Sequence, residues 1–201
     1  MRLIPSGRVL DLACGEGRFL AALDPTRYEV AGLEADPDTA GRAADRIARA
    51  GQRGTVVQGW LPRAELAPES FDLIGLFGVL PRAGSPRATL MEVSGLLRTG
   101  GYALIEVPSL SSMTARLLGS RWRPLRDPGS SYFFSPASLE RMATSCGFVP
   151  GAPRLAVPVG WPSPGTLVYA ARKSAVAARR PGLSALSGHA VSSVSPLGAS
   201  N

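Results

Sequence analysis

The sequence predicts one doubly wound α/β domain: a seven-stranded, mostly parallel sheet with helices on both faces and an antiparallel hairpin at one edge. Short runs of β-forming residues alternate with stretches of helical spacing. The strand runs are continuously apolar, which indicates a parallel sheet covered on both faces. The 201 residues, of which 45% are hydrophobic, are enough for one core and too few for two. We expect the domain to span residues 1–173 and a tail to occupy residues 174–201.

The elements follow from these patterns in chain order. The first five strands are predicted at Arg8–Ala13, Tyr28–Glu34, Thr55–Gln58, Phe71–Phe77 and Tyr102–Val107. Three helices are predicted between them, at Gly17–Leu23, Asp38–Ala50 and Ser85–Leu97, the last with Ala88, Met91, Val93, Leu96 and Leu97 on one side. A fourth helix should begin at the N-cap Ser135 and end at Cys146. Phe148–Val159 and Thr166–Arg172 then form the edge hairpin.

The end of the chain differs in composition from the rest. Residues 174–201 consist mostly of Ser, Ala, Gly and Pro, and contain no aromatic or acidic residue. Such a segment buries too little apolar surface to offset its conformational entropy. The sequence therefore predicts a disordered tail.

The net charge of +7 is concentrated toward the C-terminus. All 15 acidic residues lie at or before Glu140, so residues 1–171 carry only +3. Lys173 is the only lysine, and arginine supplies the remaining positive charge. Charge alone therefore does not predict nucleic-acid binding.

The sequence shows no pattern typical of a membrane span, a signal peptide or a disulfide framework. No apolar run approaches the ~20 residues of a membrane span, and the longest candidate, Phe71–Pro81, contains Asp72. Pro5 falls where a signal peptide would need its apolar core. Cys14 and Cys146 are too few for a disulfide framework and lack zinc-site spacing. We expect a cytoplasmic protein with reduced thiols, no metal and no membrane partner; the oligomeric state is open.

The turn after the first strand is the most informative segment. Within Val9–Leu23, a buried strand carrying Asp11 turns through small residues into a helix; these are Ala13, Cys14, Gly15 and Gly17. Small residues let a ligand approach the backbone, where the N–H groups of a helix start can donate. The sequence thus predicts a binding site here, and the alternative is a turn that only packs strand on helix.

The acidic residues indicate which ligand fits. A dinucleotide-binding turn would need a small residue where Arg18 stands, which disfavours NAD. Asp11 would repel a pyrophosphate and attract an ammonium group. Glu34 ends the second strand, 19 residues after Gly15, where a carboxylate can accept bonds from ribose hydroxyls, although a solvated loop carboxylate is its alternative. We therefore predict a nucleoside ligand with a cationic end.

Four motifs in order carry a family resemblance. DLACGEG, the acid Glu34, SFDLIGLFGVL and LLRTGGYALIEVPS together resemble the class I S-adenosylmethionine-dependent methyltransferases over residues 7–172. The segment RWRPLRDPGSSYFFSPASLERMATSCGF is similar to the small-molecule branch that includes ubiquinone-pathway enzymes. The resemblance implies a Rossmann-like fold, S-adenosylmethionine as cofactor and methyl transfer to a small-molecule acceptor.

The resemblance also implies roles for individual residues. Asp11 and the Ala13–Gly17 loop would line the methionine part of the cofactor, and Glu34 would hold its ribose. Trp60 and Leu61 would lie at the adenine, although plain packing is as good an account of Trp60. Phe77 and Gly78 would face the cofactor and the substrate. The full set of cofactor-binding candidates is Asp11, Ala13, Cys14, Gly15, Gly17, Glu34, Ala35, Trp60, Leu61, Phe77 and Gly78.

The sequence departs from the family in its candidate bases. Many relatives have a histidine in the regions that here read Val79-Leu80-Pro81-Arg82 and Gly129-Ser130-Ser131. Asp127, Tyr132 and Glu106 could border the acceptor pocket, but each has an alternative as a loop or capping group. No catalytic residue is therefore assigned, because methyl transfer from a sulfonium needs mainly alignment and exclusion of water.

A second departure is at the N-terminus, where seven residues precede Arg8 and relatives usually have a few dozen in helices. The chain is truncated, or its true start lies upstream, or a partner completes the pocket, or the pocket is open. We expect reduced cofactor affinity from an open site.

Three other functions are weighed against small-molecule methylation. The first is a degenerate methyltransferase-like module that binds without turnover. The second is methylation of a macromolecule, although FGVLP after the fourth strand lacks the Asn/Asp-Pro-Pro-aromatic pattern of base methylation. The third is an NAD-linked oxidoreductase, disfavoured by Arg18.

Overall fold

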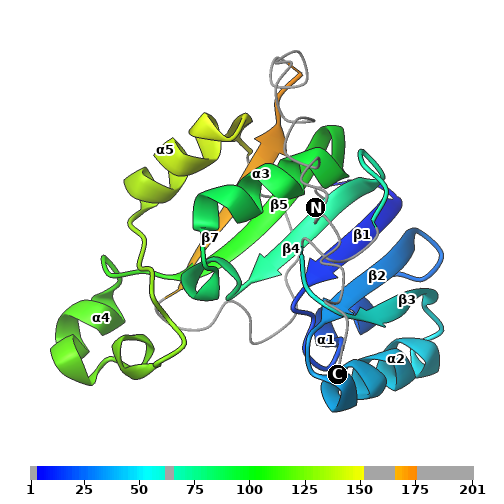
Figure 1. Ribbon diagram of the computed structural model, residues 1–201, viewed down its shortest axis with the longest axis horizontal. Coiled ribbons are helices and arrows are strands. Elements are labelled where there is room, and N and C mark those ends of the chain that lie inside the picture. The colour runs from blue at the N-terminus through cyan, green and yellow to red at the C-terminus, as the bar shows by residue number, and fades with distance from the viewer. Residues whose placement is uncertain (1–3, 62–65, 152–165, 176–201) are drawn as a thin grey trace, which may run out of the picture.

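The computed structural model describes residues 4–61, 66–151 and 166–175, which form a seven-stranded sheet in the order β3-β2-β1-β4-β5-β7-β6 (Figure 1). The strands are β1 (Gly7–Leu12), β2 (Tyr28–Glu34), β3 (Arg53–Gln58), β4 (Phe71–Phe77), β5 (Leu97–Pro108), β6 (Phe148–Pro150) and β7 (Thr166–Lys173). The α-helices are α1 (Arg18–Ala21), α2 (Pro37–Arg49), α3 (Pro86–Leu96), α4 (Met113–Leu118) and α5 (Pro136–Ser145). Three short 3₁₀ helices are η1 (Leu80–Arg82), η2 (Gly119–Arg121) and η3 (Arg123–Arg126).

The strand directions confirm the predicted fold class. β1 to β5 pair in parallel, whereas β7 is antiparallel to both β5 and β6. The antiparallel edge is therefore present, although β6 is shorter within the described residues than the predicted Phe148–Val159. Residues 152–165 lie outside the described residues, and so do residues 176–201 of the predicted tail, which was expected to begin at residue 174.

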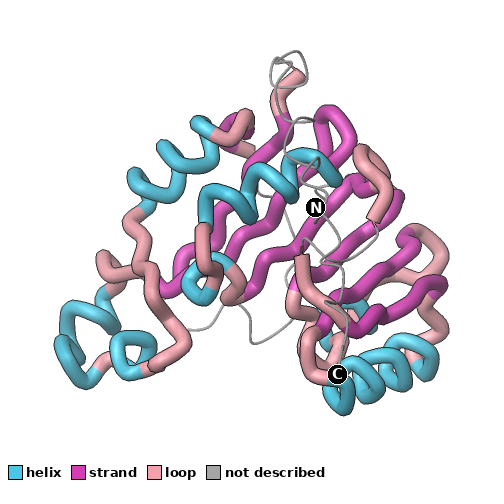
Figure 2. Tube along the Cα trace, in the orientation of Figure 1, coloured by secondary structure: helices cyan, strands magenta, loops and turns pink. Residues whose placement is uncertain are grey.

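The helices cover both faces of the sheet, as the continuous apolar strands predicted (Figure 2). On one face, α3 and α5 pack Leu90, Val93 and Leu139 onto Leu10 and Ile74. On the other face, α1 and α2 contribute a second cluster, which contains Leu20, Ala43, Ile47, Val9, Val30 and Leu73. Alternate residues of one strand thus enter different clusters, which explains why neighbouring positions such as Val9 and Leu10 are both apolar.

The helix starts follow from side-chain caps. Asp36 accepts a hydrogen bond from the Thr39 N–H at 2.8 Å. Ser135 forms a capping box with Ser138 before Pro136, which confirms the predicted start of α5. The prediction for α3 was partly wrong, because Ala88 is exposed and Leu97 already belongs to β5.

The starts of three strands are joined by one carboxylate. Asp72 at the start of β4 accepts the Arg8 backbone N–H at 2.8 Å. Its two oxygens also accept from Nη1 of Arg98 in β5, at 3.0 and 2.9 Å. This cluster fixes the edge of the sheet at the amino ends of the strands, opposite to the edge at which open α/β sheets bind ligands.

No described helix is long and apolar enough to cross a membrane.

Lys173 closes β7 onto the preceding chain. Its side chain is only 6% exposed, and Nζ donates to the Leu97 carbonyl and to Oε1 of Glu69, both at 2.8 Å. The hydrogen bond from Lys173 holds the pKa of Glu69 below its usual value. Lys173 is thus part of the folded interior, although by its position in the sequence it counts toward the positive charge of the C-terminal end.

Replacing Lys173 by Met is expected to lower the free energy of unfolding by about 1–3 kcal/mol, because the Leu97 carbonyl loses its charged donor in a buried place. Urea denaturation measures the loss. The matched control is Glu69→Gln, which should cost much less because the Glu69 carboxylate is exposed. An equal cost for the two variants would contradict the assignment of the stabilisation to the buried carbonyl.

Candidate active site

The candidate site lies where the sheet order reverses, between β1 and β4. In open α/β sheets, ligands bind outside the carboxyl ends of the strands at such a point. The loops that follow β1, β2, β3 and β4 all carry predicted site residues. The topology therefore brings together segments that are up to about 65 residues apart in the chain.

The turn after β1 is built from left-handed backbone. Ala13, Gly15 and Gly17 have φ of 56°, 53° and 72°. A Cβ at Gly15 would meet nothing within 4 Å, so the backbone there is open to a ligand. A Cβ at Gly17 would lie 3.2 Å from the Ala43 side chain of α2. Gly15 thus has the predicted open backbone, whereas packing of α1 against α2 is sufficient to explain Gly17.

Glu34 joins the ends of β1 and β2. Its Oε2 accepts the Gly15 N–H at 2.9 Å, and its Oε1 accepts the Asp36 N–H at 3.1 Å. The side chain is half-buried, while the neighbouring Ala35 is exposed. Each carboxylate oxygen keeps a second lone pair for a further donor. Glu34 is therefore placed beside the small-residue turn, as the sequence predicted.

Asp11 is buried between two glycines. It is 2% exposed and is paired in register with Gly32 of β2 and Gly75 of β4. Its Oδ1 atom has no hydrogen-bond partner among the described residues. Burial, and to a lesser extent the charge of Glu34, raises the pKa of Asp11 well above its ordinary value. An unpaired buried carboxyl of this kind is costly unless a cation or donor arrives.

An aromatic pair lies over this carboxyl. The Phe77 ring passes so close to Gly75 that a Cβ there would be 2.7 Å from ring atom Cε2 and 3.2 Å from Oδ1 of Asp11. Phe77 also meets Phe19 of α1 edge to face, with 4.8 Å between the ring centres. The Phe77 ring and Oδ1 of Asp11 thus both lie next to Gly75. Gly78 follows, exposed, with φ of 68° and its N–H bonded to the Glu106 carbonyl at 3.1 Å.

Cys14 points into the core and not into the turn. It is 8% exposed, and its Sγ occupies the space beside Gly32. Burial, followed by the charges of Asp11 and Glu34, raises the pKa of the Cys14 thiol to about 12. The thiol is neutral at physiological pH, so Cys14 is a core residue and not a nucleophile.

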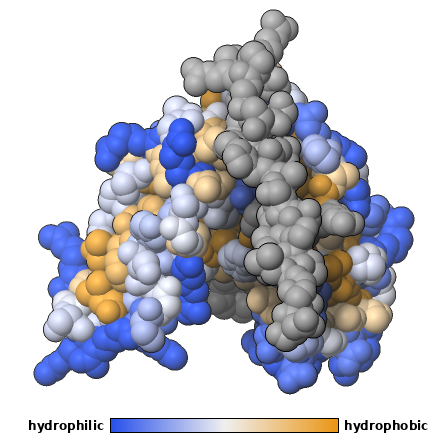
Figure 3. Space-filling view, viewed as in Figure 1, coloured by the Kyte–Doolittle hydropathy of each residue, from blue (hydrophilic) through white to orange (hydrophobic). Residues whose placement is uncertain are grey.

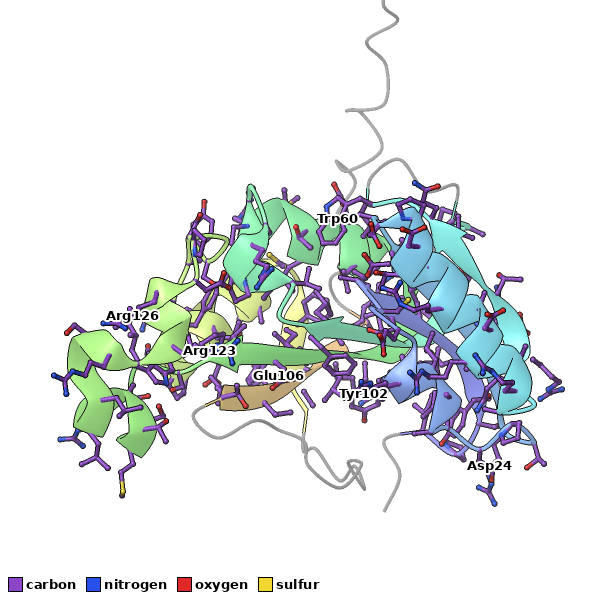
Figure 4. All side chains as sticks on the ribbon, turned by 90° about the horizontal axis from the view of Figure 1, so that it is seen from below. Asp24, Trp60, Tyr102, Glu106, Arg123 and Arg126 are labelled. Carbon is purple, nitrogen blue, oxygen red and sulfur yellow. The ribbon has the colours of Figure 1, made fainter. Side chains whose placement is uncertain are left out.

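A shallow apolar pocket, with space for about one water molecule, opens next to the turn. It is lined by Leu12, Ala13, Leu33, Trp60, Leu61, Val79 and Thr89. Trp60 is 39% exposed and lies at the rim on the side of α3 (Figure 4). The predicted residues Ala13, Trp60 and Leu61 thus share one pocket. Sequence reasoning missed the other four lining residues, of which Thr89 comes from α3 and reaches the strand ends only through tertiary packing.

The polar residues considered for proton transfer have structural contacts. Asp127 accepts from the Gly129 N–H, from Ser130 and from Arg82, and these bonds hold its pKa below the usual value. Tyr132 donates to the Gly84 carbonyl at 3.2 Å. Glu106 is buried at 8% exposure near the end of β5 (Figure 4). Among the described residues there is no cluster suited to a metal ion.

Comparison with solved structures places the fold among methyltransferases. A possible histamine N-methyltransferase from Thermotoga maritima aligns with a TM-score of 0.63 and 23% identity, over 86% of this chain and 84% of that one. Magnesium protoporphyrin IX methyltransferase from Synechocystis PCC 6803, solved with bound SAH, aligns with a TM-score of 0.64 and 15% identity, over 85% of this chain and 75% of that one. These identities show a shared fold.

Sequence comparison adds a curated relative and a family. The 23S rRNA (uracil(1939)-C(5))-methyltransferase RlmD of Chromohalobacter salexigens is 30% identical over 145 residues, which are 70% of this chain. The match spans only 30% of that relative's length. The family model described as a methyltransferase domain matches residues 2–150. The chain therefore belongs to the methyltransferase domain family, and its predicted class, an S-adenosylmethionine-dependent methyltransferase, is confirmed.

Proposed function

We propose that the protein transfers a methyl group to a small-molecule acceptor, and that Asp11, Gly15 and Glu34 hold the S-adenosylmethionine. The observation that carries the assignment of the site is the buried Asp11 oxygen without a partner, next to a turn with an open backbone. A cationic ligand is what such a carboxyl lacks.

The residues present fit the cofactor in three respects. Asp11 would attract its ammonium group, since a buried carboxylate gains most from an opposite charge. Glu34 has free lone pairs for two ribose hydroxyls beyond its bonds to Gly15 and Asp36. The pocket lined by Leu61 and Val79 is apolar, as a purine ring requires.

Bound S-adenosylmethionine supplies a methyl group that is already activated for displacement. The chain itself has to align the acceptor and exclude water. Phe19 and Phe77 form an apolar cover over the carboxyl end of β4, and they suit the second of these tasks. No described side chain is assigned as a general base, because Asp127 and Tyr132 are engaged in loop contacts.

The acceptor class rests on the segment Arg121–Phe148, which resembles the small-molecule branch. The name of the Synechocystis neighbour gives a porphyrin as acceptor, which is a small molecule. RNA is the second candidate, because the curated relative is named for rRNA. We place the protein in the cytoplasm, where either acceptor is available.

Isothermal titration with S-adenosylmethionine, followed by transfer of labelled methyl to a panel of small hydroxylated, aminated and porphyrin acceptors, tests the proposal. We expect saturable binding and transfer to one class of acceptor. Binding with transfer only to RNA would replace the acceptor assignment. Binding without transfer to any acceptor would favour the degenerate module, and no binding would overturn the site.

Cofactor binding is also expected to release a proton. The pKa of Asp11 is raised in the free protein, and an ammonium group beside it favours the ionised carboxylate. Binding should therefore release up to about one proton near the raised pKa, and affinity should increase with pH through that range. Titration calorimetry in buffers of different ionisation enthalpy counts the proton. Binding enthalpy independent of the buffer would argue against an Asp11 contact.

A further inference from the structure

The exposed apolar surface is concentrated in one lobe, which we define as residues 109–126. Of the nine large apolar residues that are exposed among the described residues, five lie in this lobe. They are Leu110 (46% exposed), Met113 (75%), Leu117 (78%), Leu118 (50%) and Leu125 (44%). Met113 and Leu117 are four residues apart on α4, so they occupy one face of the helix. Clusters of this kind mark interaction surfaces.

The same lobe is purely basic. It carries Arg116, Arg121, Arg123 and Arg126, and it contains no acidic residue. None of these four arginines forms an ion pair within the described part of the chain, whereas Arg8, Arg27, Arg46, Arg82 and Arg98 do. The lobe therefore offers positive charge that the rest of the fold does not neutralise.

The lobe is a built feature of the fold. Ala115 and Trp122 are buried at its base, at 8% and 3% exposure. Ser112 caps α4 by accepting the Ala115 N–H at 3.2 Å. The chain then returns to the sheet, where the Ser131 N–H bonds to the Pro81 carbonyl at 2.8 Å. Figure 1 shows α4 projecting from the body of the molecule, and Figure 3 shows apolar surface over the lobe bordered by hydrophilic surface.

We propose that the lobe docks the protein on an anionic lipid surface, with Met113 and Leu117 entering the interface and the arginines contacting lipid phosphates. A convex surface of aliphatic side chains ringed by cations matches the two components of peripheral membrane binding. Single-stranded nucleic acid would be met by exposed aromatic side chains for base stacking, and the one aromatic residue of the lobe, Trp122, is buried. A protein partner is disfavoured because the exposed apolar side chains of the lobe include no aromatic anchor.

This proposal departs from the sequence expectation of no membrane partner. That expectation came from the absence of a spanning segment, and docking on a lipid surface requires none. The proposal rests on the exposed side chains of the lobe and not on the identity of the methyl acceptor, and vesicle binding and methyl transfer are measured separately.

Flotation with phosphatidylcholine vesicles, with and without about one third phosphatidylglycerol, tests the docking. We expect wild type to partition onto the anionic vesicles at least about tenfold more strongly than onto neutral ones, and less at high salt. Met113→Ser with Leu117→Ser, and separately Arg121→Gln with Arg123→Gln, should each reduce partition by about tenfold. All four positions are exposed, and circular dichroism should show unchanged folding.

Matched controls replace exposed residues of the same types elsewhere. Val57→Ser with Val149→Ser, and Arg49→Gln with Arg141→Gln, should leave partition within about twofold of wild type. Equal losses in the controls, or no preference for anionic vesicles, would overturn the proposal. It would equally fail if the lobe variants weakened binding to an RNA oligonucleotide or dissolved a dimer in ultracentrifugation while vesicle binding stayed unchanged.

Discussion

Replacing Asp11 by Asn is expected to weaken S-adenosylmethionine binding by between about tenfold and a hundredfold. A charged hydrogen bond in a buried place contributes about 1.5–3 kcal/mol, and the amide cannot supply it. Asn has nearly the same shape, so the neighbouring Gly32 and Gly75 still fit around it. Titration calorimetry at one pH measures the loss.

Asp11→Asn should weaken cofactor binding, and yet its stability relative to wild type should increase with pH. The folded-state pKa of Asp11 is raised above the unfolded value near 3.8. The folded protein therefore loses stability as the pH rises from that value through the raised pKa, by about 1.4 kcal/mol per unit of pKa difference. Asp11→Asn removes this loss, so its stability relative to wild type should increase with pH.

Asp45→Asn, on the exposed side of α2, is the matched control and should change neither quantity. Denaturation curves at a series of pH values, read beside the calorimetry, separate the two effects. Wild-type affinity in Asp11→Asn would sink the assignment of the cationic end. A stability difference that stays constant with pH would show that Asp11 does not titrate as its burial demands.

Replacing Glu34 by Gln is expected to raise the Kd for S-adenosylmethionine by between about tenfold and a hundredfold, because two hydroxyl groups lose a charged acceptor. Gln keeps one carbonyl oxygen for the Gly15 N–H, so the turn should remain folded. Adenine alone should bind equally to both proteins, since it carries no ribose.

The control for Glu34 lies on the same strand. Glu29→Gln, at the start of β2 and paired with Arg8 at 3.0 Å, should leave cofactor affinity unchanged. If Glu34→Gln bound the cofactor like wild type, the carboxylate would only stabilise the turn and would not be a ribose ligand. If Glu29→Gln also weakened binding, the general negative charge of β2 would be responsible.

The strands were predictable from the sequence because burial on both faces leaves a local signal. β2 and β4 have the predicted limits, Tyr28–Glu34 and Phe71–Phe77. β5 begins at Leu97, earlier than the predicted Tyr102, because Leu97 already pairs with Phe71, ahead of an irregularity in the register where Gly100 has φ of 84°. The start of β5 depends on its pairing with β4, and no local sequence pattern indicates it.

Only those site residues that lie at the ends of recognisable strands could be placed from the sequence. Asp11, Gly15 and Glu34 could be placed together because strand ends of a parallel sheet meet at one edge. The position of Phe77 over Gly75, and the part that Val79 and Thr89 play in the pocket, depend on how α3 and the side chains pack. The short helix α4 and its exposed side chains lacked the length that makes periodicity readable.

The position of β7 bears on how the chain is synthesised and folded. The last strand among the described residues, β7, lies between β5 and β6, so the edge of β5 away from β4 has no neighbour until Lys173 has left the ribosome. An open apolar edge invites pairing with other chains. A nascent or proteolysed fragment ending at residue 150 would therefore expose this edge to other chains, although it contains every residue that the family model matches.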